Sequence, residues 1–132
     1  MGITLRPDRA SNGTEIGAAY ACADIFVLPS LYDETWGLVV NEAMNFGLPV
    51  VLSDAVGCGD DLLRLRENGF VVSASRFVIE GADAIAALVV DAELRRAYGA
   101  RSREIIAQWD VPHTTDGLVA AAHSVVGFNA PH

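Results

Sequence analysis

Residues 28–44 read LPSLYDETWGLVVNEAM, and this stretch decides the fold. The apolar run Ile25–Leu28, which ends at a Pro-Ser pair, is typical of a buried strand. An acidic loop containing Glu34 follows, and Gly37 then opens an apolar helix that carries Glu42. This order predicts a strand, loop and helix of a parallel α/β sheet. It places two carboxylates and a helix N-terminus beside the carboxyl end of one strand, where open α/β sheets bind ligands.

The chemistry of this edge suits a ligand that carries phosphate next to hydroxyl groups. The first N–H groups of a helix lack partners and its dipole favours anions, so the helix start at Gly37 favours a phosphate. Carboxylates accept hydrogen bonds from hydroxyl groups. Glu42 lies about 7 Å from that start, at roughly 1.5 Å per residue, which is close to the separation of a diphosphate from its ribose. The sequence therefore predicts a nucleotide-sugar site.

Strand-like and helical segments alternate along the rest of the chain. This alternation predicts an α/β fold, a partial Rossmann-like parallel sheet with flanking helices, in a single domain spanning residues 1–132. The expected strands are Ile25–Leu28, Pro49–Leu52 and Phe70–Val72, with a very short candidate at Ile3–Leu5. The expected helices are Glu15–Cys22, Leu38–Phe46 ended by Gly47, Asp60–Arg66, Ile79–Val90, Ala92–Gln108 and Thr115–Val126.

Composition restricts the class of partner. The chain has 132 residues, 52% of them hydrophobic, which is enough to bury one core. Its formal net charge of −8 argues against nucleic acid or an anionic membrane as the main partner. Two cysteines without metal-ligand spacing, and no secretory or spanning segment, predict a cytoplasmic protein with reduced thiols.

The ordered motif resembles a known family. The residues ADIFVLPSLYDETWGLVVNEAMNFGLPVVLSDAVGCGDDLL and, further on, ENGFVV look like the C-terminal domain of family 4 retaining glycosyltransferases. These enzymes have the GT-B fold, two Rossmann-like domains that face each other across a cleft. The family motif is two glutamates separated by seven residues, here Glu34 and Glu42. The resemblance runs from about Ala19 to Val72.

The resemblance implies roles for individual residues. Glu34 would be the catalytic-site carboxylate that faces the hydroxyls of the transferred sugar, and Glu42 would accept hydrogen bonds from the ribose. The N–H groups at the helix start would receive the distal phosphate. The implied donor-binding set is Ser30, Trp36, Gly37, Leu38, Val39 and Glu42. Trp36 departs from the family, which usually has a smaller aromatic there, and no metal or other cofactor is expected.

A glycine-rich loop follows the second expected strand, and it has two interpretations. In the family this loop borders the transferred sugar and the acceptor, and here it contains Asp54, Gly57, Cys58 and Gly59. Alternatively it is a turn, with Asp60 as N-cap of the following helix. The sequence leaves both open.

The family also implies parts that this sequence does not contain. Its C-terminal domain begins with a strand, a Gly-Arg loop and a lysine that neutralise the donor diphosphate, and an acceptor domain precedes it. We therefore expect a truncated donor-binding domain, whose N-terminal acceptor domain is supplied in cis or as a separate chain. The isolated chain would lack activity, and its open sheet edge would favour self-association.

Two other classes of function are alternatives. A non-catalytic nucleotide-sugar binding module, or an inactive remnant, would bind the donor without turnover. A flavodoxin-like or receiver-like domain has a similar layout, but receivers need a phosphorylatable aspartate at a strand end. Here Asp24 precedes its strand, Asp54 follows one, and the chain has no lysine. For a transferase, polysaccharide, lipid-linked and small glycoside acceptors are all compatible with the sequence.

Overall fold

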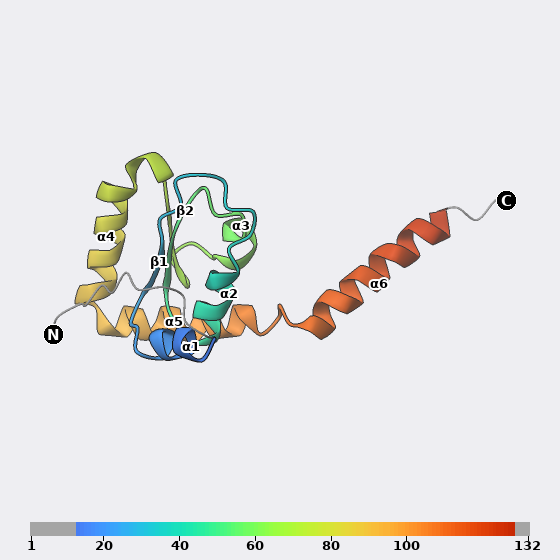
Figure 1. The fold of residues 1–132 in the computed structure, drawn as a ribbon, viewed down its shortest axis with the longest axis horizontal. Helices are drawn as coiled ribbons and strands as arrows, with labels where there is room; N and C mark the ends of the chain where they lie inside the picture. The colour runs from blue at the N-terminus through green and yellow to red at the C-terminus, as the bar shows by residue number, and fades with distance from the viewer. Residues whose placement is uncertain (1–12, 129–132) are drawn as a thin grey trace.

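A three-stranded parallel sheet forms the centre of the molecule (Figure 1). The computed structural model describes residues 13–128, so the expected strand at 3–5 lies outside the described residues. The sheet order is β1-β2-β3. Its strands are β1 (Phe26–Leu28), β2 (Val50–Ser53) and β3 (Gly69–Val72), which confirms all three internal strands that the sequence predicts.

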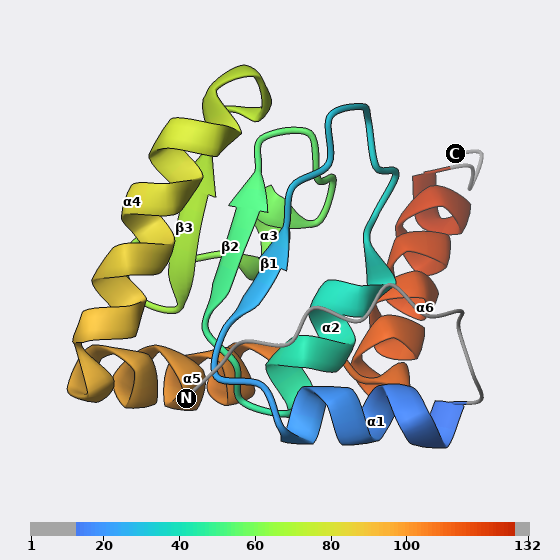
Figure 2. The same ribbon diagram turned by 60° about the vertical axis from the view of Figure 1, so that its left-hand side comes forward.

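Helices cover both faces of the sheet. Helix α4 lies against one face, while α2 and α3 lie against the other, and α5 runs beneath the sheet (Figure 2). This layering confirms the predicted α/β fold. The helices are α1 (Gly13–Ala21), α2 (Leu38–Asn45), α3 (Gly59–Leu62), α4 (Phe77–Val90), α5 (Ala92–Ile106) and α6 (Val111–Phe128), with a 3-10 turn, η1 (Ala74–Arg76), before α4.

Strand β2 is buried on both faces and organises the core. Val50 and Leu52 point toward α2, where they pack in one cluster with Met44. Val51 points the other way and packs in a second cluster with Leu88 of α4. Successive side chains of a strand alternate between its faces, which explains this division. Burying each of these side chains stabilises the folded state by about 1.5–3 kcal/mol, so β2 holds helices against both faces of the sheet.

Helix α2 ends where the sequence predicts. Gly47 adopts a left-handed conformation with φ of 73°, and its N–H donates to the carbonyl of Met44 at 2.9 Å. The next residue, Leu48, donates to the carbonyl of Ala43 at 3.2 Å. This pair of bonds closes the helix and turns the chain into β2.

Helix α3 is shorter than expected, because a buried amide ends it. The predicted helix Asp60–Arg66 stops at Leu62, and Arg66 adopts a positive φ of 62°. The side chain of Asn68 donates to the Leu62 carbonyl at 3.1 Å and accepts from a backbone N–H of the following loop at 2.7 Å. The alternative interpretation of the glycine-rich loop, with Asp60 as N-cap of this helix, was also wrong in its choice of cap. Cys58 occupies that position, and its side chain makes no capping bond.

Helix α6 extends away from the sheet (Figure 1). It begins four residues before the predicted start, because the Asp110 carboxylate accepts the backbone N–H of His113 at 2.9 Å and so acts as an N-terminal cap. Its residues from 111 to 124 are all exposed. Within residues 13–128, no helix combines the length and apolar character needed to cross a bilayer.

Candidate functional site

The loops that follow β1 and β2 are bonded together at the carboxyl edge of the sheet. The backbone N–H of Glu34 donates to the carbonyl of Ala55 at 2.8 Å, and the N–H of Gly57 donates back to Glu34 at 2.8 Å. The N–H of Cys58 donates to the Trp36 carbonyl at 3.0 Å. The structure therefore brings the predicted Glu34 segment against the predicted glycine-rich loop.

Gly57 is the point of closest approach between these two loops. A Cβ atom at this position would lie 2.2 Å from the carbonyl oxygen of Thr35 and 2.9 Å from that of Glu34. Gly59 differs, because a Cβ there would meet nothing within 4 Å. Of these two loop glycines, only Gly57 is required by the contact between the loops.

The start of α2 presents unpaired backbone donors. Gly37 is left-handed, with φ of 90°, and its carbonyl accepts the N–H of Val40 at 2.8 Å. Within residues 13–128, the N–H groups of Gly37, Leu38 and Val39 make no hydrogen bond. Leu38 and Val39 are exposed. These donors lie at the positive end of the helix dipole, so they can receive an anionic oxygen.

Both predicted carboxylates are exposed, but they are held differently. Glu34 is fixed through its backbone by the loop pairing described above. Glu42 is fixed through its side chain, since its Oε2 atom accepts a hydrogen bond of 2.9 Å from the Tyr20 hydroxyl of α1. Sequence reasoning missed Tyr20, because its only local signal is an aromatic residue in an alanine-rich helix.

Ser30, Trp36 and Asp54 shape the surrounding loops. The Ser30 carbonyl accepts the Ser53 hydroxyl at 2.7 Å, which ties the end of β1 to β2. The Trp36 indole donates to the Asn41 side chain at 2.9 Å, packs on the core and lies against the Trp109 ring. Asp54 accepts the backbone N–H of Ala74 at 2.8 Å and so fixes the loop after β3.

The Cys58 side chain points into the core instead of the site. Cys58 is fully buried, and its Sγ atom lies 4.0 Å from the Gly37 carbonyl oxygen. Burial raises the pKa of this thiol to about 11, with smaller contributions from the charges of Asp61 and Glu34. Cys58 is therefore a neutral thiol that packs in the core beside the start of α2. Within the described part of the chain, no three His, Cys, Asp or Glu side chains are grouped so that they could hold a metal ion.

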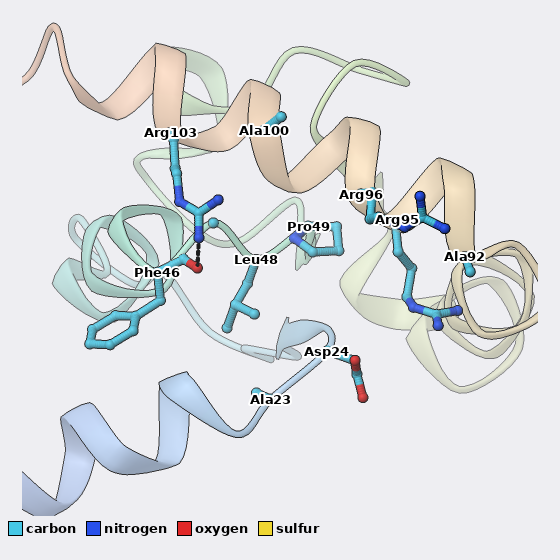
Figure 3. Close-up of a pocket in the computed structure, with 11 residues that line it drawn as sticks. Ala23, Asp24, Phe46, Leu48, Pro49, Ala92, Arg95, Arg96, Ala100 and Arg103 are labelled. Atoms are coloured by element: carbon cyan, nitrogen blue, oxygen red, sulfur yellow. Dashed lines mark hydrogen bonds between the residues drawn. The ribbon is translucent and has the colours of Figure 1, made fainter.

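A cavity of about 340 Å³ lies at the opposite, amino edge of the sheet (Figure 3). Its arginines are already engaged. Arg95 donates to two carbonyls at the end of α4, Arg96 pairs with Glu93, and Arg103 donates to the Phe46 carbonyl at 2.9 Å. These contacts stabilise helix ends and an exposed helix face. We therefore place the candidate site at the carboxyl edge, with the unpaired donors and the two glutamates.

Comparison with known proteins decides the family. The sequence model of the protein family described as "Glycosyl transferases group 1" matches residues 9–105, which include both glutamates and the start of α2. The chain belongs to this family. The match confirms the resemblance read from the motif.

Curated glycosyltransferases from different organisms match most of this chain. The sulfoquinovosyl transferase SQD2 of Arabidopsis thaliana is 39% identical over 100 residues, covering 74% of this chain and 19% of that protein. A GDP-mannose-dependent alpha-mannosyltransferase of Mycolicibacterium smegmatis is 32% identical over 115 residues, covering 87% of this chain and 29% of that protein. The chain thus spans less than a third of the length of these relatives.

Solved structures support the same fold. Sucrose-phosphate synthase from Thermosynechococcus elongatus superposes with a TM-score of 0.68 at 27% identity, over 85% of this chain and 28% of that one. The C-terminal domain of the group 1 glycosyl transferase LpcC from Francisella tularensis gives 0.67 at 24% identity, over 79% and 52%. These neighbours are GT-B glycosyltransferases. The three strands and their helices correspond to part of such a domain.

Proposed function

We propose that this chain forms the donor-binding part of a retaining glycosyltransferase. The reaction is transfer of a hexose from a nucleoside diphosphate sugar to an acceptor hydroxyl. One observation carries the proposal. At the carboxyl edge of a parallel sheet, the N–H groups at the start of α2 have no hydrogen-bond partner within residues 13–128, and an exposed glutamate stands on either side of them in the sequence. Relatives named GDP-mannose-dependent alpha-mannosyltransferases support a nucleoside diphosphate donor.

In this proposal each group binds one part of the donor. The distal phosphate accepts hydrogen bonds from Leu38 and Val39, and Gly37 gives the phosphate close access to the backbone. Glu42 accepts hydrogen bonds from the ribose hydroxyls, and Glu34 accepts them from the hexose. Asp54 and the backbone at residue 57 border the hexose and the acceptor.

In the proposed transfer step, the start of α2 stabilises the leaving group. The bond between the anomeric carbon and the diphosphate oxygen breaks, and its electron pair leaves with the diphosphate. The acceptor oxygen forms the new bond on the same face of the sugar, and the acceptor proton ends on the released diphosphate or in solvent. Unpaired N–H groups at the start of α2 stabilise the departing charge, because preorganised donors act most strongly where charge develops. No metal or cofactor takes part in the proposed step.

The first test measures donor binding by the 132-residue chain. Glu42→Gln keeps the size of the side chain and removes the charge, so its affinity for uridine or guanosine diphosphate should fall by about 1.5–3 kcal/mol. Glu104→Gln is the matched control, since Glu104 lies on α5 in a surface ion pair with Arg101. Calorimetry that gives the same affinity for Glu42→Gln and wild type would reject the ribose contact.

A second test concerns turnover. We propose that the isolated chain binds the donor without transferring sugar, and that an enzyme carrying both GT-B domains transfers it. Positioning donor and acceptor together can contribute about 7–11 kcal/mol of the barrier, and one domain supplies one wall of the cleft. Glu34→Ala in the two-domain enzyme should abolish transfer while leaving nucleotide affinity close to wild type. Full transfer by that variant would remove Glu34 from the mechanism.

The sheet edge suggests how the rest of the enzyme attaches. Within residues 13–128, β1 pairs only with β2, so its outer edge carries unpaired backbone groups. We propose that a further strand of the whole protein pairs there, and that the isolated chain self-associates through this edge. Sedimentation at micromolar concentration should detect dimers or larger species. A stable monomer would contradict self-association.

A further inference from the structure

Tyr20 lies at the end of α1 with its aromatic ring locked in place. The residue is only 9% exposed. Its ring packs against Phe26 of β1, with centroids 6.0 Å apart, and against Phe46 at the end of α2, with centroids 5.5 Å apart. Because two other elements hold the ring, the position of its hydroxyl is fixed relative to α2.

The hydroxyl of Tyr20 bonds to the carboxylate of Glu42. It donates to Oε2 at 2.9 Å, and its next acceptor, the Val39 carbonyl, is further away at 3.5 Å. Within residues 13–128, Glu42 makes no other side-chain hydrogen bond or ion pair. An exposed glutamate has several rotamers of similar energy, so this one bond selects among them.

We propose that Tyr20 is a positioning residue, which holds Oε2 of Glu42 so that Oε1 accepts the ribose hydroxyls of the donor. This inference rests on the proposed function and adds a residue to it. A tyrosine suits the task because it is a neutral donor. An arginine or lysine would neutralise the carboxylate, whereas the phenol leaves its full charge available for the ribose.

The environment of Tyr20 keeps the phenol protonated. Burial, followed by the hydrogen bond to Glu42 and the charge of that carboxylate, raises the pKa of Tyr20 to about 12. The hydroxyl of Tyr20 therefore remains protonated, and a hydrogen-bond donor, at neutral pH.

The experiment compares ribose discrimination in two matched tyrosine variants. Tyr20→Phe removes the hydroxyl and keeps the ring packing. Tyr98→Phe is the control, since Tyr98 is buried against Phe70 on the α4 side of the sheet, away from the site. The probes are uridine and guanosine diphosphate, their 2′,3′-dideoxy forms, and inorganic pyrophosphate, titrated into the 132-residue chain by calorimetry.

Tyr20→Phe should weaken binding of the ribose-bearing nucleotide by about three- to tenfold, the effect of one hydrogen bond. Binding of the dideoxy nucleotide and of pyrophosphate should stay unchanged, and Tyr98→Phe should keep the wild-type ratio. In a Glu42→Gln background, Tyr20→Phe should have no further effect on this ratio, because the positioned group is already altered.

Four results would overturn the inference, and they separate the role of Tyr20 from the proposed ribose contact. Wild-type discrimination in Tyr20→Phe would show that the hydroxyl does not position Glu42. Loss of folding in Tyr20→Phe at the assay temperature, measured by circular dichroism, would assign the hydroxyl to stability instead. Equal affinity of the wild type for ribose and dideoxy forms, or no nucleotide binding at all, would overturn the proposed ribose contact itself and the role of Tyr20 with it.

Discussion

Replacing Gly57 with alanine should separate the two loops that build the site. The new methyl group would lie 2.2 Å from the Thr35 carbonyl oxygen and 2.9 Å from that of Glu34. Both neighbours are backbone atoms, so the loops themselves must move. Overpacking of this kind costs about 1–3 kcal/mol. The movement also breaks the bond from the Gly57 N–H to Glu34, which contributes about 0.5–1.5 kcal/mol.

The two contributions together predict a loss of about 1.5–4.5 kcal/mol in the free energy of unfolding. At about 4 °C per kcal/mol for a domain of this size, the melting temperature should fall by about 6–18 °C. Gly59→Ala is the control two residues along the chain. A methyl group there meets nothing within 4 Å and lies in the first turn of α3, so stability should stay the same or rise by up to about 1 kcal/mol.

Urea unfolding followed by circular dichroism tests this pair of variants. If Gly57→Ala unfolds at a lower midpoint urea concentration, and its free energy of unfolding depends on urea with an unchanged slope, the folded state has lost stability. A Gly57→Ala midpoint equal to that of wild type would refute the close contact between the loops. Equal losses in both variants would assign the effect to the glycine-rich sequence instead of the Thr35 carbonyl.

Three other measurements test the structure. Asn68→Ala leaves buried backbone groups of the α3 loop unpaired, so it should lower the free energy of unfolding by about 1–3 kcal/mol, measured in urea. Of the two free thiols, exposed Cys22 should react with Ellman's reagent at pH 8, while buried Cys58 should react only after unfolding. Rapid reaction of both thiols in the folded protein would contradict the burial of Cys58. Burial raises the pKa of Cys58 to about 11 and of Tyr20 to about 12, above their ordinary values of 9.0 and 10.0. Because the unfolded chain loses these protons at lower pH than the folded chain, the free energy of unfolding should be highest below pH 9 and should fall as the pH rises through 9–12. A free energy of unfolding that stays constant up to pH 11 would contradict this expectation.

The sequence alone determined the strands, the helix that carries Glu42 and the edge where the candidate site is proposed. These features depend on local order: an apolar run of strand length, a glycine at each end of α2, and a carboxylate at a set distance from the helix start. Gly47 illustrates the point, because its left-handed conformation follows from its place after the last helical residue. The same order of residues carried the family resemblance, which the match over residues 9–105 confirmed.

Only the tertiary structure decided which side chains meet. Tyr20 and Glu42 are 22 residues apart, and no periodic pattern relates a residue of α1 to one of α2. The interior position of the Cys58 thiol and the early end of α3 at the Asn68 amide likewise depend on segments that pack from elsewhere. Local patterns reflect backbone preference and the burial of one face of an element. Contacts between elements depend on how the completed layers pack, which becomes fixed only when the sheet and its helices are assembled.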